Sequence, residues 1–380
     1  MRSRIYLDHN ATTPLNPVAK EQMSPFLGDC DANPSSLYLE AEQVRGQFEQ
    51  ARKSMAACFG IRPGELFFTS GATESINWAI RGTLAANPKR QKFITSKVEH
   101  SVTLDIARRL EQSGVDVHYL DVDSGGELNL DELESALDDQ TAILSLLWTN
   151  NETGVEFDVA KIGAMARKKG VIFHLDAAQK VGKGLPQLSQ LPIDLLSFSG
   201  HKFGAPKGIG GLYMRNGVGV RPLIWGGHQE TGQRAGTENV SGVMAMASAL
   251  SEATEKWPDQ ASTVRQLRDR LQEHLVCAFP EAIVNGAVAS RNENTLSMCF
   301  PGIEGHGVVL TLSQKGLACA SGSACTAHDE GPSHVLAAMG VGLRFIHGAI
   351  RFSLGANHTE AEIDKAAGLI IASVHHVSRI

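Results

Sequence analysis

The chain has 380 residues, of which 42% are hydrophobic and 20% charged, which is the composition of a globular protein long enough for two domains. A formal net charge of −6 argues against nucleic acid or an anionic membrane as the main partner, so the substrate should be small. No charged-then-apolar segment opens the sequence and no apolar run reaches membrane-spanning length, which predicts a cytoplasmic protein. The six cysteines lack Cys-x-x-Cys spacing and are expected to be reduced thiols.

The N-terminal part of the chain, from Asp8 to Ser36, is rich in turn residues and lacks periodicity, so we expect an arm that wraps over other structure. Strand and helix patterns then alternate. Strands are predicted over 66–69, 92–95, 115–120, 142–148, 171–176 and 193–198, and helices over 45–59, 76–84, 102–113, 130–137 and 159–169. This alternation predicts a mostly parallel sheet with helices on both faces.

The second half of the chain begins with a segment, 204–239, whose glycines and polar residues predict an exposed binding loop after a short strand at 212–214. A helix over 240–254 is expected to lead to a second domain near Asp259. That domain should hold helices 261–278, 306–315 and 360–375 and strands 283–284, 295–300 and 350–354. We therefore expect an arm, 1–15, that joins the small domain, a large domain, 16–258, and a small C-terminal domain, 259–380.

Two predicted strands end in residues that can carry chemistry. The strand 193–198 runs into Ser199-Gly200-His201-Lys202, and ligands usually lie at such strand ends. A desolvated lysine there can lose its proton and form a Schiff base with a carbonyl compound. The strand 171–176 ends in Asp176, which could keep the ring nitrogen of pyridoxal phosphate (PLP) protonated. The alternatives are a solvated loop lysine and a helix N-cap.

Other candidate residues lie at the ends of predicted elements. The turn Ser70–Ser75 between a strand and a helix could bind a phosphate through free backbone N–H groups, or could only cap the helix. His100 could stack on a flat cofactor ring or lie on the surface. Asn151 could hydrogen-bond cofactor or substrate, or serve a turn. Arg351 could bind a carboxylate bidentately or form an ordinary salt bridge.

A loop of small residues, from Ala320 to Pro332, surrounds Cys325. Small neighbours would leave the sulfur accessible, and His328 or His334 could help to deprotonate it, so the thiol is a candidate nucleophile. The alternative is a buried cysteine that packs as a small hydrophobic residue.

Taken together, the chain resembles the NifS/IscS-type cysteine desulfurases, which are PLP enzymes of the class V aminotransferase group, from Tyr6 to about Asp364. The motifs that carry the resemblance are Asp8 to Pro14, Asn33 to Ser36, Thr69 to Glu74, Glu99-His100, Asn150 to Gly154, Asp176 to Gln179, Ser199 to Lys202, Pro206 to Gly210, Arg234 to Val240, Gly322 to Cys325 and Arg351 to Gly355. The resemblance implies PLP fold-type I: a large α/β domain with a mostly parallel seven-stranded sheet between helices, and a smaller α/β C-terminal domain. The chain departs from the family at Tyr38, where a histidine is usual, and at Ala41, where a glycine is common.

The resemblance also implies roles for single residues. Lys202 would carry the internal aldimine, Asp176 would pair with the pyridine nitrogen, Gln179 would contact the ring hydroxyl and His100 would stack on the ring. The phosphate would be bound by Ala72, Thr73, Ser199 and His201. Thr237 from a second subunit would also bind it, which requires a homodimer. The substrate carboxylate would be held by Asn33, Asn151 and Arg351. No metal is implied.

The implied reaction converts L-cysteine to L-alanine, with the sulfur passing to Cys325 as a persulfide for delivery to an acceptor protein. Two alternatives stay open. One is a PLP aminotransferase or lyase that does not use Cys325, such as a selenocysteine lyase. The other is a non-catalytic relative that acts as a scaffold. The destination of the sulfur, whether iron–sulfur clusters, tRNA thiolation, DNA phosphorothioation or a vitamin, is also open.

Overall fold

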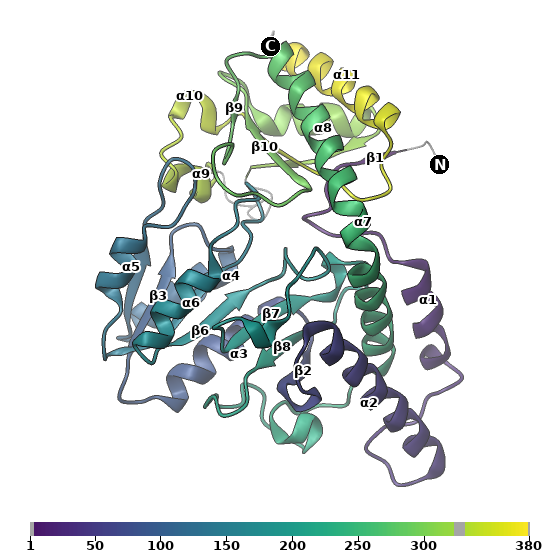
Figure 1. The fold of residues 1–380 in the computed structure, drawn as a ribbon. Helices are drawn as coiled ribbons and strands as arrows, with labels where there is room; N and C mark the ends of the chain where they lie inside the picture. The colour runs from purple at the N-terminus through teal and green to yellow at the C-terminus, as the bar shows by residue number, and fades with distance from the viewer. Residues whose placement is uncertain (1–3, 323–330, 379–380) are drawn as a thin grey trace.

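The computed structural model describes residues 4–322 and 331–378 and has two α/β bodies, lower and upper in Figure 1. The lower body contains a seven-stranded sheet. Its strands, in spatial order, are β2 (Leu66–Thr69), β8 (Gly210–Met214), β7 (Leu195–Ser199), β6 (Ile172–Asp176), β5 (Thr141–Leu147), β3 (Lys92–Ser96) and β4 (Asp116–Leu120). From β7 to β4 all neighbours are parallel, whereas β8 is antiparallel to both β2 and β7. The predicted mostly parallel sheet is confirmed.

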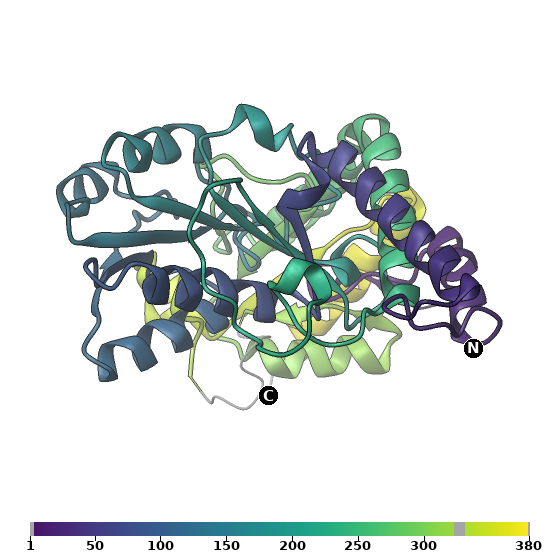
Figure 2. The same cartoon turned by 90° about the horizontal axis from the view of Figure 1, so that it is seen from below.

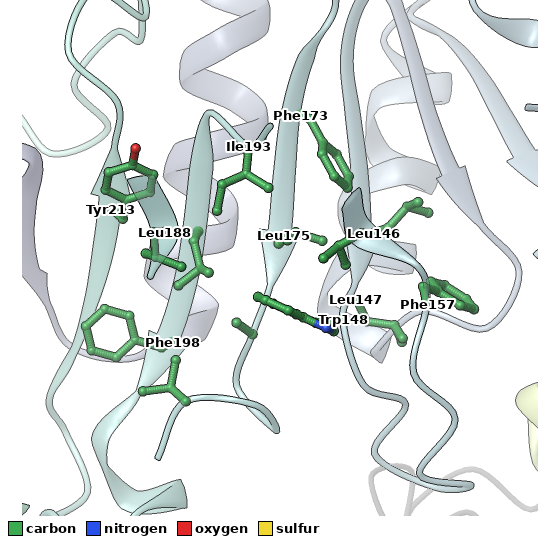
Figure 3. Close-up of a cluster of buried hydrophobic side chains, with 14 of the residues drawn as sticks. Leu146, Leu147, Trp148, Phe157, Phe173, Leu175, Leu188, Ile193, Phe198 and Tyr213 are labelled. Carbon is green, nitrogen blue, oxygen red and sulfur yellow. The ribbon is translucent and has the colours of Figure 1, made fainter. Parts of the chain in front are cut away.

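Helices cover both faces of this sheet, as Figure 2 shows. They are α2 (Leu39–Phe59), α3 (Ala72–Ala86), α4 (Ser101–Gln112), α5 (Leu130–Ala136) and α6 (Val159–Lys168). Because side chains alternate along a strand, adjacent residues enter different cores. Leu195 packs with α3 and α4, while Leu196 and Phe198 pack in the larger core of Figure 3. Burial on both faces explains why these strands read as continuous apolar runs.

The upper body is built on a second, antiparallel sheet of four strands. They are, in order, β12 (Ala320–Ser321), β13 (Ala349–Ser353), β10 (Thr295–Cys299) and β9 (Ile283–Val284). Its helices are α8 (Gly305–Gln314), α9 (His334–Ala338), α10 (Leu343–Ile346) and α11 (Glu360–Val377). A hydrophobic cluster of its own fills the part of this body around β10, β13, α8 and α11, whereas residues of α9 and α10, such as Leu336 and Ile346, pack in the same cluster as the core of the lower body. The arm joins it through β1 (Ile5–Tyr6), which pairs in parallel with β11 (Leu317–Ala318).

One long helix, α7 (Val240–Ala278), connects the two bodies (Figure 1). The break predicted between helices 240–254 and 261–278 is therefore wrong. Pro258 lacks an N–H and crowds the preceding turn, which normally ends or kinks a helix. Here the helix continues through it because both halves are packed: Met246 in the core of the lower body and Leu271 in the core of the upper body. The domain boundary at Asp259 stays a prediction.

The sequence patterns did not predict helix α1 (Pro17–Met23), which begins at the side-chain cap Asn16. Five short 3₁₀ turns complete the described secondary structure, namely η1 (Ser24–Leu27), η2 (Pro63–Glu65), η3 (Leu188–Gln190), η4 (Gly200–Lys202) and η5 (Gln229–Gly232). None of the helices in residues 4–322 and 331–378 is long and apolar enough to cross a membrane.

Candidate active site

A cavity of about 480 Å³ lies where strands β5, β6 and β7 end and helix α3 begins. This is the edge of a parallel sheet at which ligands bind in α/β proteins. Ten of the residues predicted for the site line it: Ala72, Thr73, His100, Asn151, Asp176, Gln179, Ser199, His201, Lys202 and Arg351. Segments far apart in the sequence are thus brought together at one place.

Lys202 lies in the η4 turn directly after β7 and is half-buried. Its Nζ donates hydrogen bonds to two backbone carbonyl oxygens of the arm, those of Asn10 at 2.6 Å and Ala11 at 3.1 Å. The solvated-loop alternative therefore does not describe this lysine, which has a fixed place in the cavity wall.

Asp176 ends strand β6 and is 7% exposed. Its Oδ1 accepts a hydrogen bond from the Ala178 N–H at 2.9 Å, and the next residues form a turn and not a helix, so the N-cap alternative is wrong. Burial raises the pKa of Asp176, and the nearby charges of His100 and Lys202 oppose that rise. A buried carboxylate of this kind is stabilised by a cationic ligand group.

His100 is the N-cap of α4, where its Nδ1 accepts a hydrogen bond from the Val102 N–H at 3.2 Å. Burial lowers the pKa of His100, Asp176 raises it, and Lys202 lowers it further. Burial thus favours the neutral form of the imidazole, whose flat ring lines the cavity.

The anion-binding end of the cavity is formed by the start of α3. Its N-cap is Gly71, and no described side chain caps it, so the helix-cap alternative for Ser70 or Thr73 is wrong. The turn packs tightly on β8: a Cβ atom at Gly210 would lie 2.6 Å from the Gly71 Cα. The first N–H groups of the helix are thus left for a ligand, and such groups bind phosphate well.

Two more predicted phosphate residues, Ser199 and His201, also line the cavity. His201 Nδ1 is 3.1 Å from the Thr12 hydroxyl. Burial lowers the pKa of His201 to about 4, with further lowering by Lys202 and Lys207, so its ring is neutral and can donate or accept a hydrogen bond.

Arg351, on β13, also lines the cavity and is 3% exposed. Its Nη1 donates to the Asn151 carbonyl oxygen at 2.9 Å, and its Nη2 donates to Asp8 Oδ1, also at 2.9 Å. Its Nε is buried and has no hydrogen-bond partner among the described residues. The structure therefore contains the salt bridge of the alternative interpretation, yet it leaves a donor over for a carboxylate ligand.

Two predicted site residues, Asn33 and Thr237, do not line this cavity. Asn33 is exposed and its side chain accepts a hydrogen bond from the Ser35 N–H at 2.9 Å. Thr237 is exposed and lines a separate hollow of about 140 Å³ together with Ser70 and Gly208. Cys325, like His328, lies outside the described residues. The roles of these residues stay predictions.

Other cysteines and histidines near the loop can be placed. Cys319 lies between β11 and β12 and is buried, and burial raises the pKa of its thiol to about 12. His334 Nε2 lies 2.9 Å from the Glu99 carbonyl oxygen and is thereby linked to the turn that carries His100. A thiol as protonated as that of Cys319 is a poor nucleophile.

Several cavity residues were missed by the sequence patterns, among them Asn10, Ala11, Thr149 and Lys207. Lys183 was also missed. It is buried next to Gln179, whose Oε1 accepts from its Nζ at 3.4 Å, and burial together with Lys202 lowers its pKa to about 7. No apolar periodicity and no motif in the sequence indicates that Lys183 is buried. The one signal is that it follows a segment predicted to be buried.

The cavity fits a flat, anionic cofactor such as PLP. Its volume is in the range of small-molecule sites. One end offers open helix N–H groups for a phosphate, and the buried acid Asp176 can pair with a protonated ring nitrogen. Lys202 supplies an amine in the wall of the same cavity.

Comparison with known proteins identifies the family. A family model described as Aminotransferase class-V matches residues 5–366, so the chain belongs to the class V aminotransferase family. A relative in Trichormus variabilis, "Cysteine desulfurase 2", is 46% identical over all of this chain and 95% of its own length. A solved "NIFS-LIKE PROTEIN" is 36% identical with a TM-score of 0.92 and covers 98% of this chain and 100% of its own. "SspA in complex with cysteine" is 32% identical with a TM-score of 0.82, over 94% and 100%. The predicted family and fold-type I architecture are confirmed.

Proposed function

We propose that this chain is a PLP-dependent cysteine desulfurase that converts L-cysteine to L-alanine and passes the sulfur, as a persulfide of Cys325, to an acceptor protein. The observation that carries the proposal is the meeting of Lys202, Asp176 and Arg351 in one cavity. Full-length similarity to relatives named cysteine desulfurase supports it.

Enzymes of the class V aminotransferase family generally depend on PLP, whose conjugated ring accepts electrons from the substrate Cα when it is bound. In this chain the residues that would hold the cofactor are Ala72, Thr73, His100, Asn151, Asp176, Gln179, Ser199, His201 and Lys202, with Thr237 of a second subunit. The hydrogen bond from Gln179 Nε2 to the Asn10 carbonyl oxygen, at 2.9 Å, supports this role because it orients the side chain.

The protein groups then have separate tasks. Arg351, with Asn151 and Asn33, would hold the substrate carboxylate, and the Nζ of Lys202 would take the proton from Cα. The thiolate of Cys325 would attack the substrate sulfur: a sulfur–sulfur bond forms as the carbon–sulfur bond breaks. The electron pair of the broken bond stays with the carbon skeleton, and Cβ and Cα each take up a proton to give alanine.

We also propose a homodimer in the cytoplasm. The position of Thr237 supports the dimer, because it is exposed and lies outside the cavity of its own chain. Three exposed apolar side chains, Leu37, Leu39 and Trp225, lie close in sequence to Asn33 and Thr237. Exposed apolar side chains of this kind are typical of a surface that a second subunit covers. The free state of the five cysteines that the structure describes supports a reducing compartment.

The test is to incubate the PLP-loaded protein with L-cysteine and to measure alanine and sulfide. The Cys325→Ser variant should bind PLP normally but form alanine on the order of 10³-fold more slowly, because a hydroxyl is a poor nucleophile at neutral pH. Cys319→Ser is the matched control and should keep its activity, since that thiol is buried and protonated. A persulfide mapped to Cys319, or full activity without Cys325, would disprove the proposed sulfur transfer.

A further inference from the structure

We propose that two residues of the N-terminal arm, Asp8 and Asn10, are positioning residues of the active site. Asp8 holds Arg351 in the orientation that receives the substrate carboxylate, and Asn10 holds the Nζ of Lys202. The inference rests on the proposed function and deepens it, because it gives the arm a part in both substrate binding and turnover.

The arm brings these two side chains to neighbouring parts of the site. Asp8 forms a parallel bridge with Ser353, and residues 9–11 form a turn in which the Ala11 N–H donates to the Asp8 carbonyl oxygen at 3.1 Å. Asp8 reaches Arg351, and Asn10 reaches the loop of Asn151. The intervening His9 instead faces the rings of Tyr6 and His358, with centroids 5.1 and 5.5 Å away.

Asp8 fixes one edge of the Arg351 guanidinium. The arginine side chain is 3% exposed and that of Asp8 is 21% exposed, so little water competes for their contact. With Nη2 bound to Asp8 and Nη1 bound to the Asn151 carbonyl, the planar group cannot rotate, and its remaining donors have one direction. Without Asp8, the bond to the Asn151 carbonyl would be the remaining hydrogen bond of the guanidinium among the described residues.

Asn10 is locked from several directions and is 1% exposed. Its N–H donates to the Ser353 hydroxyl at 2.9 Å, and its Nδ2 donates to the Thr295 hydroxyl at 2.9 Å and to the Asn151 carbonyl at 3.1 Å. Its Oδ1 accepts from Asn294 Nδ2 at 3.0 Å. The side chain of Asn10 thus ties the arm to the upper body and to the loop of the site.

The backbone carbonyl of this locked residue is the acceptor for both Lys202 Nζ, at 2.6 Å, and Gln179 Nε2, at 2.9 Å. A carbonyl acceptor stabilises the protonated amine more than the free amine. Asn10 therefore gives the lysine a defined place to hold a proton that it has taken up. Moving this carbonyl would change the behaviour of Lys202 without touching the lysine itself.

The test compares variants of the two residues in the PLP-loaded enzyme. Asp8→Ala should raise KM for cysteine about tenfold and leave kcat within about threefold, and Asp8→Asn, which keeps an acceptor oxygen, should restore KM. Binding of L-alanine, measured by calorimetry, should weaken in Asp8→Ala by the same factor. Asn10→Ala should lower kcat about tenfold with KM nearly unchanged.

A second readout does not need the cofactor. Acetic anhydride should label Lys202 about fivefold faster at pH 8 in cofactor-free Asn10→Ala than in the parent protein, because an ammonium with a poorer acceptor releases its proton more readily. If Asn10→Ala does not fold, Thr295→Val replaces it in the test. This variant removes one hydrogen-bond partner of Asn10 that lies outside the arm, and it should also speed the labelling of Lys202. His9→Phe is the matched control and should leave kcat, KM and labelling unchanged.

If both arm variants showed a lower kcat together with a higher KM, and the labelling of Lys202 were unchanged, the arm would only stabilise the fold. That result would overturn the proposal. A parent protein that forms no alanine would instead refute the proposed function. In that case the labelling rate and L-alanine binding still decide whether Asn10 and Asp8 position Lys202 and Arg351.

Discussion

Replacing the buried Lys183 by methionine should stabilise the protein in a pH-dependent way. Lys183 is buried, and burial followed by the charges of Lys202 and Lys180 lowers its pKa from an ordinary 10.5 to about 7. At 1.36 kcal/mol for each pH unit, keeping this lysine protonated costs the folded state about 5 kcal/mol. The lost hydrogen bond to Gln179 offsets about 1 kcal/mol of the gain, and local relaxation offsets more.

The sign of the pH dependence follows from proton binding. Below about pH 7 Lys183 is protonated in the folded and the unfolded state, so the folded state carries the whole cost. Between pH 7 and 10.5 the unfolded chain binds a proton that the folded protein has released, so the cost falls with rising pH and vanishes near pH 10.5. Lys183→Met should therefore gain about 2–3 kcal/mol at pH 6 and almost nothing at pH 10.

The assay is urea unfolding of the cofactor-free protein at pH 6, 8 and 10. Lys180→Met is the matched control, because Lys180 pairs with Glu156 at 2.8 Å and its removal strands a half-buried carboxylate. That variant should lose stability at pH 6, the opposite sign. A gain for Lys183→Met that is equal at pH 6 and pH 10, or a loss at pH 6, would refute the reasoning.

Three further predictions concern Glu230 in the loop 204–239, Lys202 and the oligomeric state. Glu230→Gln should lower the free energy of unfolding by about 3 kcal/mol, because Glu230 accepts hydrogen bonds from buried Arg52 at 2.6 and 2.9 Å and from the Phe68 N–H. Glu49 is the exposed partner of Arg52, so Glu49→Gln should lower it by less than about 1 kcal/mol. Borohydride treatment with PLP should label Lys202 on a peptide map, and Lys202→Ala should lose both the label and turnover; a label on Lys183 would contradict this. Sedimentation equilibrium should give a dimer, and Thr237→Ala should weaken PLP binding, whereas an active monomer would exclude the shared site.

The fold was predictable because its signals are local. Runs such as Leu195–Phe198 carry apolar residues at adjacent and not only at alternate positions, since both faces of the strand are buried, and the helices between the strands show their own period. Asp176 and Lys202 could be placed together for the same reason. Strands β6 and β7 are parallel neighbours, so the residues after them meet at one edge of the sheet.

What the sequence patterns missed depends on contacts between distant segments. The bond from Lys202 to Asn10 joins residues 192 positions apart, and nothing in a turn-rich arm indicates which strand end it will meet. The continuity of α7 through Pro258 was missed because the local rule for proline is opposed by packing at both ends of the helix. The role predicted for Thr237, binding the phosphate in a second subunit, cannot be tested on one chain.

Repulsion between positively charged groups in and beside the cavity indicates that its ligands are anionic. Lys202 lowers the pKa of both Lys183 and His201, and Lys207 adds to the effect on His201, so positive groups at this site disfavour one another. Evolution keeps such a cost where the charges serve binding, because a phosphate and a carboxylate bring the negative charge that these groups lack. The arm fits the same account: Asp8 and the Asn10 carbonyl hold Arg351 and Lys202 apart and in place until the anionic groups arrive.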